Sequence, residues 1–347
     1  MSAGTEGLLP EERAEGGAPG RLRLVRVPGP AGDGFADAVR TGLGTRPRSL
    51  PCRFFYDERG SRLFEEICRL PEYYPTRTEE AILARAAAEV ASALGGGVTL
   101  VELGSGSSRK TRLLIEALLA RQGRLHYAPL DISEAFLVET ARGLLARYPG
   151  LKVTAVAGEY RDALHHLPRA EGPRLVLFLG SNVGNLDEAE AVDLLSLLAA
   201  SLSPGDRLLV GFDRVKDPAV LERAYNDAAG VTEAFNKNLL LRVNRELGGR
   251  FDLDAWAHEA PWVAGRSRVE MRLVSREAQR VPVGALASVF EFERGEAIHT
   301  ESCHKYTVPG FLGICAAAGL APVRLWSDPA EWFGLALLSP ARPGAAS

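Results

Sequence analysis

The segment that most constrains the fold of this 347-residue chain is residues 98–113, VTLVELGSGSSRKTRL. Its apolar run at 98–103 predicts a buried strand of a parallel sheet, followed by a glycine-rich turn at 104–108 and a helix from Arg109 onward. Glycine lets the backbone approach a ligand closely, and the N–H groups of a helix N-terminus favour an anionic or hydrogen-bonding group. We therefore predict that a nucleotide-like cofactor lies across this turn.

The spacing of the glycines distinguishes between nucleotide cofactors. A dinucleotide fingerprint reads G-x-G-x-x-G, but Arg109 occupies the third glycine position. A phosphate-binding loop reads G-x-x-x-x-G-K-[ST], and the Lys-Thr pair after Gly106 lacks the first glycine in register. The pattern Glu102-x-Gly104-x-Gly106 instead resembles motif I of the doubly wound S-adenosylmethionine (SAM)-dependent methyltransferases.

The composition argues against several classes of protein. The chain has 41 Lys and Arg against 44 Asp and Glu, a formal net charge of −3 and no basic block, so we expect no nucleic-acid partner. No apolar run reaches the roughly 18 residues of a membrane span, and there is no signal-peptide pattern. The four cysteines show no C-x-x-C spacing, which is typical of a reduced, cytoplasmic protein.

Strands and helices alternate after the glycine turn, which implies a parallel sheet with right-handed crossovers. The further predicted strands are residues 125–130, 153–156, 175–179 and 207–212. Ligands bind such sheets beyond the carboxyl ends of the strands, where Asp131, Glu159 and Gly180 follow. For Asp131 two interpretations stay open: it accepts from ribose hydroxyls, or it is the N-cap of the helix predicted at 133–148.

The periodicity changes after residue 213. One long helix is predicted at 218–247, and another precedes the glycine turn at 79–94, with Thr76 as its cap. Alternating strands follow the first of these, and a last helix and two strands form an antiparallel edge hairpin. These segments are residues 268–274, 289–293, 298–304, 308–318, 322–326 and 333–338.

We therefore predict an α/β fold in which a doubly wound, Rossmann-like class I methyltransferase sheet carries an inserted α+β substrate-binding lobe. We expect a monomer. The predicted organisation is a flexible N-terminal tail at 1–30, the substrate-binding lobe at 31–77 and 214–304, and the SAM-binding methyltransferase domain at 78–213 and 305–340.

A series of motifs runs in order from about residue 50 to residue 338. They are Phe55-Tyr56-Asp57, Leu70-Pro71-Glu72-Tyr73-Tyr74-Pro75-Thr76-Arg77-Thr78-Glu79, Val101-Glu102-Leu103-Gly104-Ser105-Gly106, Phe178-Leu179-Gly180-Ser181, Gly184-Asn185, Arg223-Ala224-Tyr225, Phe235-Asn236-Lys237-Asn238, Glu270-Met271 and Thr300-Glu301. Together they resemble the histidine-specific methyltransferases that make hercynine for ergothioneine. The resemblance implies that SAM is the cofactor, that L-histidine is the substrate, and that its α-amine is methylated three times.

The resemblance also implies a set of cofactor-binding residues. These are Gly104, Gly106, Lys110, Asp131, Glu159 and Tyr160. Glu159 is expected near the adenine, although the family usually has Asp at this position.

A second set implied by the resemblance forms the substrate pocket. Its members are Tyr56, Tyr73, Gly180, Asn185, Tyr225, Met271, Glu301 and Cys303. Asn185 and Tyr225 are expected to hold the α-carboxylate, and Tyr56 is the candidate catalytic residue, which steers the α-amine and passes its proton to water. Tyr73 and Glu301 are expected to face the imidazole, with Glu301 accepting from a ring N–H.

One residue of this pocket departs from the family pattern. The family usually has serine at Cys303, and a thiol is the weaker hydrogen-bond partner, at a cost of about 0.5 to 1.5 kcal/mol. An N-methyltransferase for tryptophan, tyrosine or another amino acid therefore remains an alternative, as do a nicotinamide enzyme and a non-enzymatic regulator that binds the cofactor. His299, Cys303 and His304 lack a standard zinc spacing, so we predict no metal.

Overall fold

An eight-stranded sheet lies at the centre of the computed structural model, which describes residues 20–27, 34–167 and 170–341. The strand order is β1-β5-β4-β3-β6-β7-β15-β14, and neighbours are parallel except for the last two pairs, which are antiparallel. The strands are β1 (Leu22–Arg26), β3 (Thr99–Leu103), β4 (Leu125–Asp131), β5 (Leu151–Ala157), β6 (Arg174–Phe178), β7 (Arg207–Asp213), β14 (Leu320–Ser327) and β15 (Phe333–Pro340).

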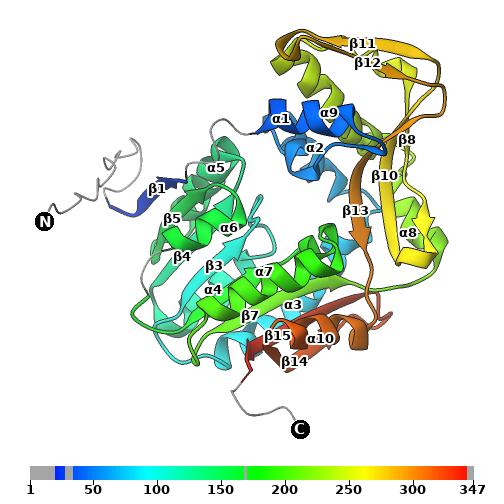
Figure 1. Cartoon of the computed structure of the whole chain (residues 1–347). Helices are drawn as coiled ribbons and strands as arrows, with labels where there is room; N and C mark the ends of the chain where they lie inside the picture. The colour runs from blue at the N-terminus through cyan, green and yellow to red at the C-terminus, as the bar shows by residue number, and fades with distance from the viewer. Residues whose placement is uncertain (1–19, 28–33, 168–169, 342–347) are drawn as a thin grey trace, which may run out of the picture.

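Helices cover both faces of this sheet (Figure 1), because each face of a parallel sheet is apolar and must be buried. The first three of the following helices pack on one face and the last two on the other: α3 (Tyr74–Ser92), α4 (Arg112–Gln122), α5 (Glu134–Arg147), α7 (Glu188–Ser201) and α10 (Val308–Ala317). The predicted doubly wound α/β sheet is thereby confirmed. Within the described ranges, no helix is long and apolar enough to cross a membrane.

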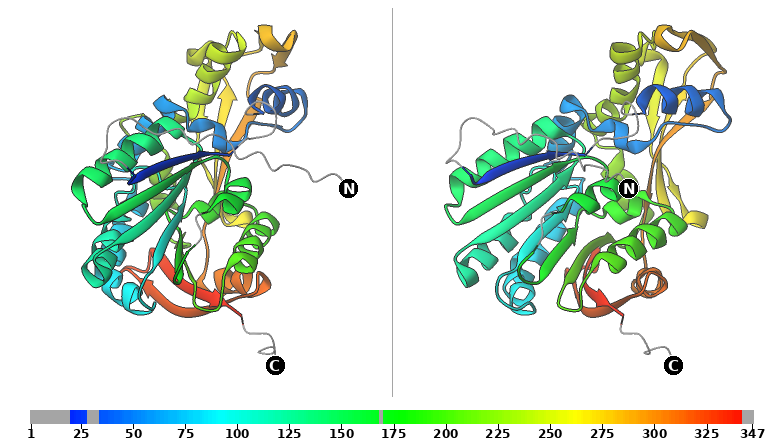
Figure 2. Two further views of the ribbon diagram at one scale, coloured as in Figure 1. Left: turned by 90° about the vertical axis from the view of Figure 1, so that its left-hand side faces the viewer. Right: turned by 60° about the vertical axis from the view of Figure 1, so that its left-hand side comes forward.

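A lobe of mixed helices and strands stands beside the large sheet (Figure 2). Its own sheet has the order β2-β13-β10-β8, with β9 paired to β10, and β11 and β12 form a separate hairpin. Its elements are α1 (Phe35–Gly44), β2 (Arg48–Ser49), the 3-10 helix η1 (Cys52–Phe55), α2 (Glu58–Ile67), α8 (Pro218–Tyr225), α9 (Val231–Leu247), β8 (Trp256–Glu259), β9 (Trp262–Val263), β10 (Arg268–Ser275), β11 (Gln279–Val283), β12 (Ser288–Phe292) and β13 (Ala297–His304). The predicted residue boundaries of the two domains stay a prediction.

The lobe has an aromatic core that joins its two sequence segments. The ring of Phe55 stacks on that of Phe235 from α9, with centroids 4.4 Å apart. Trp256 of β8 is fully buried and meets Phe292 of β12 edge-on at 4.9 Å. The Phe55–Phe235 contact holds the segment before β3 against the segment after β7, and the Trp256–Phe292 contact packs the later segment on itself.

The prediction of a flexible tail over residues 1–30 is wrong for β1, which pairs in parallel with β5 at the edge of the large sheet. Leu22 and Leu24 pack against one core of that sheet and Val25 against the other, as the two-residue period of a strand requires. The guanidinium of Arg21 donates to the carbonyls of Leu145 and Tyr148, both at 3.1 Å. Residues 1–19 and 28–30 lie outside the described residues.

Two predicted helix boundaries are also wrong. The helix expected to begin at Glu79 begins at Tyr74, because Pro75 occupies its first turn, and Thr76 is not its cap. The single helix expected at 218–247 is divided into α8 and α9. The Asp227 carboxylate accepts from the N–H groups of Val231 (2.9 Å) and Thr232 (2.8 Å), so it starts a new helix there.

Candidate active site

A cavity of about 930 Å³ lies between the lobe and the carboxyl ends of the parallel strands. A smaller cavity of about 40 Å³ adjoins it and shares several lining residues, including Tyr56, Tyr73, Gly180, Asn185 and Glu301. The larger cavity is also lined by Gly104, Gly106, Lys110, Asp131, Glu159 and Tyr160, and the smaller one by Tyr225, Met271 and Cys303. The structure therefore brings all the residues of the two predicted sets to one connected region.

The turn after β3 leaves its backbone open to this region. Gly104 has φ +68°, and a Cβ at that position would lie 2.5 Å from the Tyr160 hydroxyl oxygen and 2.8 Å from the Asn182 amide nitrogen. Gly106 has φ +48°, and a Cβ there would meet nothing within 4 Å. Close packing requires a glycine at the first position, whereas the left-handed backbone and the open space beside it favour a glycine at the second.

The Asp131 carboxylate connects the end of β4 to the glycine turn. Its Oδ2 accepts from the Gly106 N–H at 2.9 Å and its Oδ1 from the Ser133 N–H at 3.0 Å. The N-cap position of α5 belongs to Ser133, so the interpretation of Asp131 as the N-cap residue is wrong. A carboxylate has about four lone-pair sites, so Asp131 retains acceptor capacity toward the cavity.

A group of buried side chains joined by hydrogen bonds supports the glycine turn. Sequence reasoning did not predict most of these contacts. Thr111 Oγ1 donates to Glu102 Oε1 at 2.5 Å, and the Tyr127 hydroxyl donates to Glu102 Oε2. Tyr127 also lies 2.9 Å from the Ser108 hydroxyl. Burial raises the pKa of Glu102 to about 7, against the opposing effect of these hydrogen bonds. The apolar pattern of a buried strand does not predict a network of polar side chains such as this one.

Glu79 is a further residue that the sequence analysis did not assign to the site. Its carboxylate is fully buried, pairs with the Lys110 ammonium, and accepts from the Gly180 N–H at 2.9 and 3.0 Å. It thus contacts one residue of the predicted cofactor set and one of the substrate set. Its helical spacing from the buried Ile82 and Leu83 places an acid on the apolar face of α3, which is a signal that sequence reasoning could have used.

Glu159 lies at the rim of the larger cavity. Its Oε1 is 3.3 Å from Nε of Arg53, and both side chains are more than 40% exposed. Because Arg53 belongs to the lobe and Glu159 follows β5, this ion pair joins the two parts of the molecule beside the larger cavity. An ion pair this exposed contributes little to stability. Its relevance is its position beside the larger cavity.

Glu301 is the central polar group of the substrate side. Asn185 Nδ2 donates to its Oε1 at 3.2 Å, and the Cys303 thiol donates to its Oε2 at 3.2 Å. Burial raises the pKa of Glu301 to about 7. Met271 of β10 is directly opposite Glu301 in the antiparallel pairing with β13, next to an irregularity of register that re-aims the strand.

Aromatic rings form the wall around Tyr56. Its ring meets those of Phe64 and Phe235 edge-on, each at 5.7 Å between centroids. Burial, and after it the charge of Glu301, raises the pKa of Tyr56 well above its ordinary value, so its hydroxyl stays protonated. The Tyr73 ring meets the Tyr225 ring edge-on at 6.0 Å.

The two histidines near Cys303 contact separate partners. His299 Nε2 lies 3.0 Å from the Ser302 hydroxyl, and His304 Nδ1 lies 3.0 Å from the Gly184 carbonyl. In the part of the chain that the structure describes, no group of three or more His, Cys, Asp and Glu side chains is arranged to hold a metal ion.

The sheet order, the glycine turn beyond β3 and the acid at the end of β4 define a class I SAM-dependent methyltransferase. The residues fit that cofactor, because a cradle without side chains at Gly104 and Gly106 opens on a cavity lined by Lys110 and Asp131. The chain belongs to the histidine-specific SAM-dependent methyltransferase family, whose model matches residues 35–340.

Three relatives illustrate this membership. The histidine N-alpha-methyltransferase of Mycolicibacterium smegmatis is 47% identical over 311 residues, which cover 88% of this chain and 96% of the relative. The protein of the same name from Mycobacterium tuberculosis is 46% identical over 299 residues, or 86% of this chain and 92% of the relative. The ergothioneine biosynthesis protein 1 of Neurospora crassa is 32% identical over 313 residues, or 85% of this chain but only 34% of that protein.

Proposed function

We propose that this protein uses SAM to methylate the α-amine of L-histidine three times, giving hercynine, the first step of ergothioneine biosynthesis. The observation that carries the proposal is the 47% identity to a histidine N-alpha-methyltransferase over 96% of that relative's length. The family match over residues 35–340 supports an enzyme and argues against a nicotinamide enzyme or a non-catalytic regulator.

The geometry of the pocket supports histidine as the amino acid. Glu301 presents a buried carboxylate that can accept from an imidazole N–H, and it is held by Asn185 and Cys303. Asn185 has two amide N–H donors, one of which binds Glu301, so the other is available to the substrate α-carboxylate. The Tyr225 hydroxyl lines the same small cavity and supplies a second donor.

When bound, SAM would supply an activated methyl group for direct in-line displacement by the neutral α-amine, with S-adenosylhomocysteine as the leaving group. The protein therefore contributes orientation and exclusion of water rather than activation. Gly180, with φ +77°, has no side chain where the two cavities meet, and this leaves room for the amine. In the first two transfers the protonated Tyr56 hydroxyl accepts from an N–H of the amine, which directs the nitrogen lone pair, and it relays to water the proton that the methylated nitrogen releases. The third transfer gives a quaternary ammonium and releases no proton.

The test is mass spectrometry of the purified protein with SAM and an equimolar mixture of the twenty amino acids. We expect histidine alone to gain the mass of one, two and then three methyl groups. Full-rate trimethylation by Tyr56→Phe would contradict the role of Tyr56. If tryptophan, tyrosine or another amino acid gains the methyl groups instead, the cofactor assignment stands and the proposed substrate is wrong, with the pocket around Glu301 and Cys303 selecting a different side chain.

A further inference from the structure

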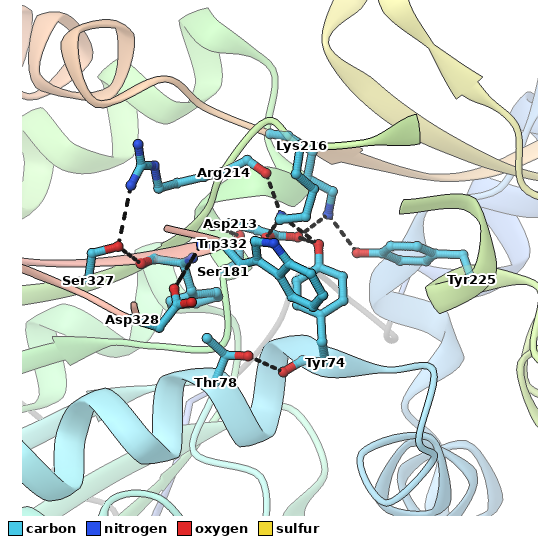
Figure 3. Close-up of polar contacts among 12 residues, drawn as sticks. Tyr74, Thr78, Ser181, Asp213, Arg214, Lys216, Tyr225, Ser327, Asp328 and Trp332 are labelled. Carbon is cyan, nitrogen blue, oxygen red and sulfur yellow. Dashed lines mark hydrogen bonds and ion pairs between the residues drawn. The ribbon is translucent and has the colours of Figure 1, made fainter. Parts of the chain in front are cut away.

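A buried group of charges lies behind Tyr225 (Figure 3). Lys305 Nζ donates to the Tyr225 hydroxyl oxygen at 2.8 Å and lies 2.9 Å from Asp213 Oδ2. Asp213 also accepts from the Tyr74 hydroxyl at 2.6 Å and from Lys216 Nζ at 2.6 Å. Five segments supply these residues: the end of β7, the connection from β7 to α8, the end of α8, the start of α3, and the residue after β13.

The donor pattern determines where the Tyr225 proton points. An ammonium group has only donors, so the Tyr225 oxygen must act as acceptor toward Lys305. The hydroxyl proton is therefore directed away from Lys305. The Cys303 thiol lines the same small cavity as Tyr225, and a thiol is a weaker acceptor for the hydroxyl proton than a carboxylate.

The charge of this group is positive at neutral pH. Lys305 and Asp213 are both almost completely buried, and their pair leaves the Lys216 charge in excess. Lys305 and Lys216 lower the pKa of Asp213 despite its burial, so that it is ionised. Burial lowers the pKa of Lys216 to about 8, which keeps it mostly charged at pH 7. The nearby Asp328 is only half-buried and accepts from the backbone N–H groups of residues 330, 332 and 333.

We propose that Lys305 is a positioning residue which, held by Asp213, turns the Tyr225 hydroxyl toward the substrate α-carboxylate and places positive charge behind it. The inference rests on the proposed function and goes beyond it. Recognition of the carboxylate then depends on a buried cation, Lys305, which is connected to the substrate by two successive hydrogen bonds through Tyr225. Neutral donors alone do not account for it. The site thereby selects amino acids with a free carboxylate over their amides, because only an anion gains from the charge.

The test compares L-histidine with L-histidinamide, which replaces the carboxylate by a neutral amide. Lys305→Met removes the charge and keeps the length of the side chain. We expect KM for histidine to rise about 10- to 100-fold, as on loss of a charge-assisted hydrogen bond, while histidinamide changes little. The ratio of kcat/KM for histidine to kcat/KM for histidinamide therefore falls, and the Kd of SAM stays constant.

The controls separate positioning from a general loss of structure. Lys216→Met removes a lysine of the same group that does not contact Tyr225, so it should lower the ratio less than Lys305→Met. If Lys305→Met does not fold, Lys305→Gln keeps a donor and lacks the charge, and a lower ratio is again expected. In the Tyr225→Phe background the change at Lys305 should have little further effect on the ratio.

One result would overturn the inference: a ratio of kcat/KM for histidine over histidinamide that is unchanged in the Lys305 variants, whether both values fall by the same factor or neither falls. A wild-type protein that methylates no histidine overturns the proposed function instead. The two failures are distinguishable, because the second is already seen in the wild-type protein before any variant is made.

Discussion

Cys303 is the residue at which the substrate pocket departs from its family. Its Sγ lies 3.2 Å from Glu301 Oε2 and 3.8 Å from Asn185 Oδ1, where a hydroxyl would make stronger hydrogen bonds. We expect Cys303→Ser to lower KM for histidine about 2- to 10-fold, the equivalent of one improved hydrogen bond, and to leave kcat unchanged. Steady-state kinetics with saturating SAM measures both constants.

Cys315 provides the matched control for this substitution. It is a fully buried cysteine of α10 in the core of the large sheet and lines neither cavity. Cys315→Ser should lower the melting temperature without changing KM, because it buries a hydroxyl in an apolar core. A Cys303→Ser variant with the wild-type KM would show that the thiol already satisfies the pocket.

At the scale of an element, β7 controls a site residue on another element. A Cβ at Gly211 would lie 1.8 Å from Glu79 Oε1, so Gly211→Ala should displace this carboxylate from Lys110 and from the Gly180 N–H. We expect the Kd of SAM to rise about tenfold, since a buried charged partner is lost. Isothermal titration calorimetry with SAM gives the value.

Gly313 of α10 is the control for the same chemical change. A Cβ there meets nothing within 4 Å, and the residue is exposed within a helix. Gly313→Ala should stabilise the protein by about 0.5 to 1 kcal/mol and leave SAM binding unchanged. If Gly211→Ala destabilises the protein but binds SAM like the wild type, Glu79 has no part in holding Lys110 for the cofactor.

The large elements of the fold were predictable because each carries a long apolar signal. Strands such as β3 and β7 are nearly continuous apolar runs, and their order follows from the strict alternation with helices. β1 was not predictable in this way, because only five residues of mixed polarity form it and its hydrogen bonds to β5 supply the missing stability. The break between α8 and α9 depends on hydrogen bonds to Asp227, which periodicity does not reveal.

The residues of the site also fall into those that the sequence predicted and those that it did not. Residues of the two predicted sets were identified by motif, and the structure gathers them around the two cavities. Glu79, Tyr127 and Lys305 were not assigned to the site, although Glu79 ends one of the motifs, since their importance comes from burial beside a particular partner in a distant segment. A buried polar residue looks like any surface residue in the sequence until its helix or strand is placed.

At the scale of the whole molecule, stability depends on pH through Glu301. Burial raises its pKa from 4.5 to about 7, so between these values the folded protein binds more protons than the unfolded chain. Stability from this group therefore falls as pH rises through that window, by roughly 3 kcal/mol in total. We expect Glu301→Gln to melt at the wild-type temperature near pH 4.5 and clearly above it near pH 8, in calorimetry without ligands.

Glu296 gives a control of opposite sign. Its carboxylate accepts from Arg46 at 3.0 Å and Arg48 at 2.7 Å, and these hydrogen bonds lower its pKa to about 2 despite some burial. A depressed pKa stabilises the fold above the unfolded value of 4.5, so Glu296→Gln should lower the melting temperature near pH 8. An equal response of both variants at both pH values would contradict the assignment to Glu301.

The division of the lobe between two distant parts of the sequence also sets an order of events during synthesis. α2 (Glu58–Ile67) packs against α9 (Val231–Leu247), which leaves the ribosome about 160 residues later. Translation adds roughly 5 to 20 residues per second, so α9 emerges about 10 to 30 s after α2. During this time the apolar face of α2, formed by Leu63, Phe64 and Ile67, is not packed against α9. The nascent chain therefore completes all six parallel strands of the large sheet, β1 and β3 to β7, while the first wall of the substrate pocket is still exposed to chaperones.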